Sequence, residues 1–271
     1  MNKKYNLTTP QKSIYLIEQY YSNTNINNIC GTAVIEQKIN FEILEKAINF
    51  LIESNDSFRI KFVKENNTLL QYVEDYTFTK ISLEKINSNE ELAELENNLV
   101  KRIFNLEDNY YELKMFKFPD STGGFILNIH HILADSWTLG LTCKKIMQAY
   151  NNLLNNEGNI VNENNSYIKY IESESNYFKS QKFIKDKEYW ENKFDTLPSV
   201  VSLPSSQNNA TSAFNCNANR LLFTFSKDYV NKILDFCSTH KISTFNFFIS
   251  VLATYIHKIS SAKKFVMGTP L

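Results

Sequence analysis

Two adjacent histidines, His130 and His131, are the residues of this chain best suited to chemistry, and they make up half of its four histidines. They close an apolar run from Phe125 that predicts a buried strand. Asp135 and Ser136 follow as candidate caps of a helix. An imidazole titrates near neutral pH, so it can accept a proton from an attacking amine or hydroxyl. The chain therefore carries imidazoles and a carboxylate in one short loop between a strand and a helix.

The two histidines cannot share one task if the strand is regular. Successive strand side chains point to opposite faces, so we expect one imidazole to be structural and the other to be free for the reaction. Asp135 could orient His131 or pair with a cation. The obvious cation is Arg59, which would be costly to bury without a partner.

Other interpretations of these residues remain open at this point. Adjacent histidines, taken alone, are more often incidental than catalytic, and an isolated Asp135 is more often a helix cap. Ser136 lacks the GxSxG surroundings of an activated serine, and the histidine pair lacks a third ligand at metal-binding spacing. We therefore expect no metal site.

Composition excludes several classes of partner. The formal net charge of zero argues against nucleic-acid binding and against an anionic membrane surface. The longest apolar run, 245–256, is interrupted by polar residues and is too short to cross a bilayer. Four scattered cysteines without a CxxC pair, and a start without signal-peptide character, predict a cytoplasmic protein with reduced thiols.

The elements that position the histidines alternate between helical and strand patterns. This mixture predicts an α/β class, as an α+β two-layer sandwich with a mixed sheet. Polar or irregular connections are expected at 155–165 and 197–219. The expected helices are 9–21, 41–52, 90–104, 136–154, 166–180, 183–194, 227–240 and 243–259, and the expected strands are 30–35, 58–62, 69–73, 110–118, 124–131, 220–225 and 265–267.

Five segments together resemble the condensation domains of non-ribosomal peptide synthetases. Residues 128–137 are similar to the HHxxxDG motif, and residues 54–62 are similar to RHExLRTxF. Residues 8–15 resemble the family's first motif, 167–170 its fourth, and 266–270 the strand that enters the second lobe. The five segments occur in the family's order over nearly the whole chain. We therefore no longer expect the two histidines to be incidental.

The resemblance implies two lobes, each like chloramphenicol acetyltransferase, with a tunnel between them. It implies an N-terminal lobe at 1–160, a helical and irregular connection at 161–218, and the start of the C-terminal lobe at 219–271. The chain stops before the family's fifth to seventh motifs. We therefore expect that it cannot complete a two-sided site and that the isolated chain is inactive.

The resemblance also assigns roles to individual residues. His131 becomes the catalytic or substrate-positioning histidine, and His130 supports it. Asp135 becomes structural, paired with Arg59.

Three further positions follow from the same resemblance. Gln11 and Trp137 are expected to line the tunnel. Ser136 stands where the family has glycine, so its Cβ and hydroxyl are expected to crowd the loop or to strain a conformation that suits glycine.

The implied reaction is attack of an acceptor amine on a donor thioester, which forms an amide. Both substrates hang on phosphopantetheine arms of donor and acceptor peptidyl carrier proteins, next to an adenylation domain, so this chain binds no cofactor of its own. The alternatives are an epimerisation domain, a free-standing acyltransferase of the same superfamily, or a non-catalytic carrier-docking or structural remnant.

Overall fold

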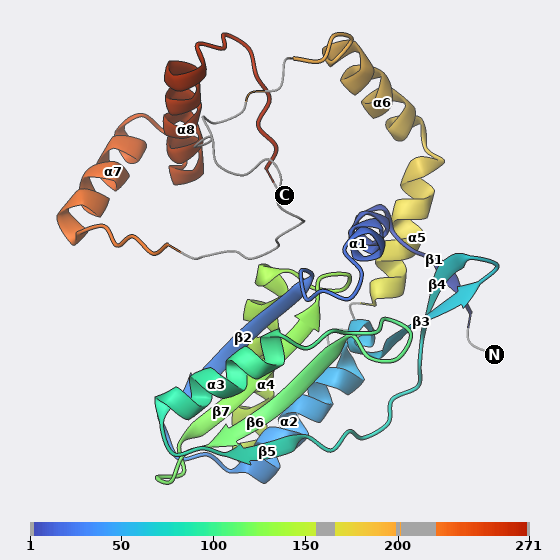
Figure 1. Ribbon diagram of the computed structural model, residues 1–271, viewed down its shortest axis with the longest axis vertical. Helices are drawn as coiled ribbons and strands as arrows, with labels where there is room; N and C mark the ends of the chain where they lie inside the picture. The colour runs from blue at the N-terminus through green and yellow to red at the C-terminus, as the bar shows by residue number, and fades with distance from the viewer. Residues whose placement is uncertain (1–2, 156–165, 199–200, 202–220, 270–271) are drawn as a thin grey trace. The chain divides into compact units, whose positions relative to one another are not determined.

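The computed structural model describes residues 3–155, 166–198, 201 and 221–269 (Figure 1). The chain divides into two compact units, residues 1–180 and 181–271. Residues 156–165 of the expected polar connection and most of the irregular stretch at 197–219 lie outside the described residues. The division into two lobes of one type stays a prediction.

A four-stranded sheet forms the centre of the first unit. Its strand order is β2-β7-β6-β5, with β7 antiparallel to both neighbours and β5 parallel to β6. The mixed orientation confirms the expected α/β class with a mixed sheet, but the expected two layers are wrong, because helices pack on both faces of the sheet. The bounds are β2 (Asn28–Ile35), β5 (Ser82–Lys85), β6 (Tyr111–Lys117) and β7 (Gly123–His130).

Helices cover both faces of this sheet, which explains why all eight residues of β7 are buried. The helices α2 (Phe41–Ser54) and α4 (Ser136–Leu154) pack together on one face, and α3 (Asn89–Val100) covers the other (Figure 1). A strand that is covered on both faces needs a continuous apolar run rather than an alternating one.

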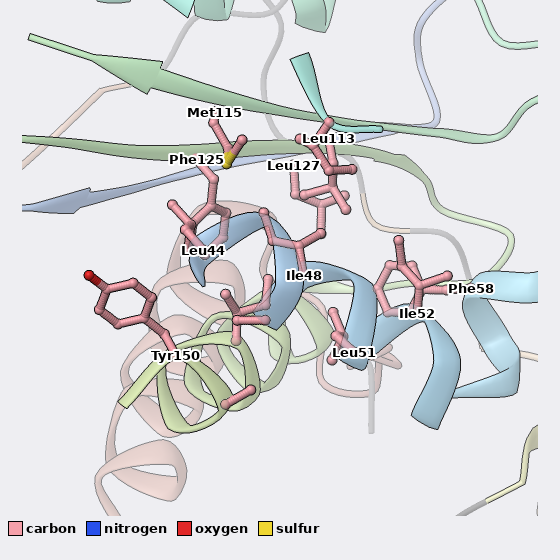
Figure 2. Packing of buried hydrophobic residues seen from close by; sticks show 14 of the residues in the cluster. Leu44, Ile48, Leu51, Ile52, Phe58, Leu113, Met115, Phe125, Leu127 and Tyr150 are labelled. Carbon is pink, nitrogen blue, oxygen red and sulfur yellow. The ribbon is translucent and has the colours of Figure 1, made fainter. Parts of the chain in front are cut away.

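The main core lies between α2 and the sheet. In Figure 2, Leu44 and Ile48 of α2, one helical turn apart, point toward four side chains of β6 and β7. These four are Leu113, Met115, Phe125 and Leu127. On the α3 side, Leu92 and Leu99 pack with Phe116 and Ile126. Ile126 therefore faces α3, and because strand side chains alternate, Asn128 and His130 share that face.

A smaller three-stranded sheet has the order β1-β4-β3, with β1 (Tyr5–Asn6), β3 (Ile60–Glu65) and β4 (Thr68–Val73). Asn66 and Asn67 both have positive φ and form the expected hairpin turn between β3 and β4. The expected strand 58–62 is only partly correct, because residues Asp56–Arg59 form the 3-10 helix η1 and β3 starts at Ile60.

The helices α1 (Thr9–Tyr20) and α5 (Tyr167–Phe178) complete the first unit. Asp56 accepts the Tyr167 N–H at 2.7 Å and the Ser166 hydroxyl, so η1 holds the N-terminus of α5. We expected α5 to lie in a connection between lobes, but these contacts tie it to the first unit.

The second unit contains α6 (Gln181–Lys193), α7 (Lys227–Thr239) and α8 (Thr244–Ser260). The expected strands at 220–225 and 265–267 are wrong in the part that the structure describes, since residues 221–225 and 265–267 have no regular structure. A strand needs neighbouring backbone to bond to, and the described residues of this unit contain no other strand. Across the described chain, every helix is too short or too polar to span a membrane.

Candidate active site

The histidine loop connects the central strand to a helix. β7 ends at His130, and α4 begins at Ser136. The His130 N–H donates to the Tyr110 carbonyl and the His131 N–H donates to the Asn27 carbonyl, each at 2.7 Å. The end of the strand is therefore held from both sides before the chain enters the loop.

His130 is a buried, neutral imidazole. Its side chain is 2% exposed, and its Nε2 lies 3.1 Å from Oε2 of Glu18 on α1. The backbone N–H of Ile132 donates to Nδ1 at 3.1 Å. Since a backbone N–H can only donate, Nδ1 is the unprotonated nitrogen and Nε2 carries the proton that bonds to Glu18. Burial lowers the pKa of His130, and the Glu18 hydrogen bond opposes that shift only in part.

His131 is exposed directly beside this buried ring. Its imidazole has no hydrogen-bond partner among the residues that the structure describes, although its backbone is fixed. The two histidines thus separate as strand alternation predicts. The His130 ring makes its hydrogen bonds within the fold, whereas the exposed His131 ring could accept a proton from a substrate.

Asp135 is the N-cap of α4. Its carboxylate accepts the Thr138 N–H and the Thr138 hydroxyl, each at 2.7 Å, and its own N–H donates to Thr138 Oγ1 at 3.3 Å. The hydrogen bonds from Thr138 lower the pKa of the Asp135 carboxyl. This reciprocal arrangement fixes the point where the loop becomes a helix.

The expected pairing of Asp135 with Arg59 is wrong. Arg59 directs its guanidinium at backbone carbonyls, with Nε to Ile52 at 3.2 Å, Nη1 to Glu74 at 2.6 Å and Nη2 to Glu53 at 3.3 Å. A guanidinium is a rigid fork of donors, so three carbonyls satisfy it without a carboxylate. Arg59 therefore joins the C-terminal end of α2 to the segment after β4.

Comparison with known proteins identifies the family to which this chain belongs. The family model for the condensation domain matches residues 1–271. The chain belongs to the condensation domain family.

Two curated relatives are synthetases from Bacillus subtilis. The chain is 30% identical over 277 residues to a subunit of surfactin synthase and 25% identical over 275 residues to a subunit of plipastatin synthase. Both alignments cover 98% of this chain, but only 8% and 10% of the two relatives. The condensation domain chain thus corresponds to a small part of each large protein.

Solved condensation domains share the fold. The condensation domain of the monacolin K polyketide synthase MokA matches 96% of this chain and 60% of its own, with a TM-score of 0.80 and 16% identity. A double mutant of the starter condensation domain of the rhizomide synthetase RzmA matches 74% of this chain and 50% of its own, with a TM-score of 0.67 and 20% identity. This chain spans about half to three fifths of the length of those domains.

Ser136, where the family motif has glycine, fits its position without strain. It is the exposed first residue of α4, and it is not among the residues with positive φ. The expected strain of a glycine-specific conformation is therefore wrong, because the first residue of a helix adopts a backbone conformation open to every L-residue. Trp137 follows it with 76% of its surface exposed, and its tunnel-lining role stays a prediction.

Gln11 does not line an open space in this condensation domain chain. It is 1% exposed, and it exchanges two amide hydrogen bonds with Gln71, at 2.9 Å and 2.8 Å. Its Oε1 also accepts the N–H of Thr8 at 2.9 Å, which closes the capping box of α1. The expectation that Gln11 lines the tunnel is wrong, because both ends of its amide are used to join α1 to β4.

Glu18 and Asn27 are site residues that the sequence analysis missed. Oε2 of Glu18 contacts His130, and it also accepts the Asn27 Nδ2 donor at 2.7 Å. Glu18 and His130 are 112 positions apart, so no local motif connects them. Among the described residues, no group of three His, Cys, Asp or Glu side chains could hold a metal ion.

Proposed function

We propose that this chain is part of a condensation domain of a non-ribosomal peptide synthetase and that it forms an amide between two carrier-bound substrates. The observation that carries the proposal is the exposed imidazole of His131, which has no hydrogen-bond partner among the described residues, beside the buried, neutral His130 at the end of β7. Relatives named as surfactin and plipastatin synthases support the synthetase setting. A double mutant of the starter condensation domain of RzmA has been solved with C8-CoA and Leu-SNAC, which supports thioester substrates.

In the proposed reaction, the nitrogen of the acceptor amine attacks the thioester carbonyl of the donor. The C–N bond forms, the C–S bond breaks, and the proton lost by nitrogen passes by way of His131 to the leaving thiolate. Proton transfer by a positioned imidazole contributes roughly 10²–10⁴-fold to such steps. Because both reactants are tethered, proximity supplies a further part of the rate.

The proposed partners follow from this chemistry. Donor and acceptor carrier proteins present the substrates on phosphopantetheine arms, and an adenylation domain supplies the activated building block. His130 and Asp135 hold the two ends of the loop. In this proposal the chain binds no cofactor of its own, because the carrier proteins present both substrates. The proposed location is the cytoplasm.

The test replaces His131 with Ala in the synthetase that carries this chain, loaded with defined donor and acceptor thioesters. We expect the amide product to fall by at least about 100-fold. His240→Ala is the matched control, since His240 is exposed at the end of α7, and it should leave the product unchanged. Undiminished amide formation by His131→Ala would overturn the catalytic assignment. If the wild-type synthetase inverts the stereocentre of the donor and forms no amide, the result would instead point to an epimerisation domain.

A further inference from the structure

We infer that Glu18 is a positioning residue that holds the His131 loop through hydrogen bonds rather than through its charge. The catalytic consequence rests on the proposed function, whereas the structural consequence does not. Glu18 lies near the C-terminal end of α1, and its side chain is 16% exposed. One of its oxygens, Oε2, accepts from Asn27 at 2.7 Å and contacts Nε2 of His130 at 3.1 Å.

The first route from Glu18 to the loop passes through the His130 ring. Nδ1 of that ring accepts the N–H of Ile132, which is itself 2% exposed. Loss of the Glu18 acceptor would leave a buried Nε2–H without a partner, and such a group is costly. The ring would then rotate or change tautomer and release Ile132. His131 lies between these two residues, so both of its neighbours depend on Glu18.

The second route passes through Asn27. This residue is 7% exposed, its side chain donates to Glu18, and its carbonyl accepts the His131 N–H at 2.7 Å. The same carboxylate oxygen therefore holds the side chain of His130 directly and the backbone of His131 through Asn27. In this way Glu18 connects α1 to both histidines.

The geometry argues against a proton relay from Glu18 to His131. A relay would need a free nitrogen on the far side of the His130 ring, but Nδ1 is occupied by the backbone N–H of Ile132. The carboxylate is thus an acceptor that is held in place. An amide oxygen in the same position accepts the same two hydrogen bonds, so glutamine should replace Glu18 and alanine should not.

The test compares Glu18→Gln with Glu18→Ala in the synthetase, and Glu94→Ala on the exposed face of α3 is the matched control. For Glu18→Ala we expect kcat for amide formation to fall ~10-fold or more, because small displacements of a catalytic group are costly, with KM little changed. Glu18→Gln should stay within about 3-fold of the wild type, and Glu94→Ala should equal it.

A second measurement reads the ring directly. In the 271-residue chain with ¹⁵N-labelled histidine, imidazole spectra should show His130 with its proton on Nε2 in the wild type and in Glu18→Gln, and altered signals in Glu18→Ala. Wild-type kcat and an unchanged His130 spectrum in Glu18→Ala would overturn the inference. An equal loss of kcat in Glu18→Ala and Glu18→Gln would show that Glu18 acts through its charge and would overturn the hydrogen-bond role. If Glu18→Ala does not fold, Glu18→Gln still decides the matter, because altered His130 signals in it contradict the role.

These readouts separate the inference from the proposed function. If His131→Ala keeps full activity while Glu18→Ala alters the His130 signals, the proposed function fails and the positioning role stands. If His131→Ala abolishes the product while Glu18→Ala changes neither kcat nor the spectrum, the reverse holds.

Discussion

Replacement of Asp135 distinguishes the two roles that this residue could have in the histidine loop. The structure makes it the N-cap of α4, and the sequence motif suggested an ion pair with Arg59. Asparagine keeps the capping oxygen and removes the charge, whereas alanine removes both. A cap therefore predicts that Asp135→Asn is mild and Asp135→Ala is not. An ion pair predicts that both are equally damaging.

The expected magnitude follows from the contacts of the carboxylate. Alanine leaves the Thr138 N–H without its partner at 2.7 Å, and loss of such a cap costs about 1 kcal/mol. For a folded unit of this size, 1 kcal/mol lowers Tm by about 2–4 °C. Asparagine is nearly as good a cap, so we expect a change within about 0.5 kcal/mol.

The measurement is urea unfolding of the three proteins, repeated with Arg59→Gln in each background. We expect the effects at Asp135 and Arg59 to add within about 0.5 kcal/mol, because the two side chains share no hydrogen-bond partner among the described residues. Equal destabilisation by asparagine and alanine, together with a coupling above ~1 kcal/mol, would refute the capping role.

The same residue gives the loop a pH dependence of known sign. Hydrogen bonds from Thr138 lower the folded pKa of Asp135 below its ordinary value of 3.8. A depressed carboxyl pKa contributes stability above the unfolded pKa, and that stability is lost as the pH falls through the folded pKa. The advantage of the wild type over Asp135→Ala should therefore decrease as the pH falls below about 4. An advantage that stayed constant from about pH 6 down to about pH 2 would contradict the assignment.

The remaining predictions concern three residues whose local space the structure defines. Ser136→Gly should leave amide formation in the synthetase unchanged and unfolding within ~0.5 kcal/mol, because Ser136 is an unstrained, exposed helix residue; a marked gain of activity would contradict this. Gly124→Ala should destabilise the chain by about 3 kcal/mol, since its Cβ would stand 1.8 Å from the Ala33 carbonyl oxygen. Gly140→Ala on α4 meets open space and should stabilise by ~0.5–1 kcal/mol, and thermal unfolding that ranks the two variants otherwise would refute both expectations.

Local sequence patterns determined the elements that build the histidine loop. The apolar run before His130 marked a buried strand, and the spacing of Leu44 and Ile48 marked the helix that packs on it. The pair Asn66-Asn67 marked a hairpin. Each of these depends on backbone geometry and on burial of nearby residues, which a short stretch of sequence contains.

Other elements formed against their local pattern. The strand Ser82–Lys85 is short and largely polar, and it exists because β6 offers it a parallel partner. The apolar stretches 221–225 and 265–267 carry the strand pattern and form no strand in the described structure. Strand formation depends on a neighbouring backbone, so the pattern within a segment cannot decide it.

The sequence by itself determined which residues stand in the loop and that His130 and His131 must face opposite ways. Only the tertiary structure decided which ring is buried, because α3 covers one face of β7 and Glu18 of α1 contacts His130 on that face. It also decided that Arg59 bonds to carbonyls and not to Asp135. The type of a residue determines which hydrogen-bond partners its polar group needs when it is buried. Partners that are far apart in the sequence come together only when the chain has folded.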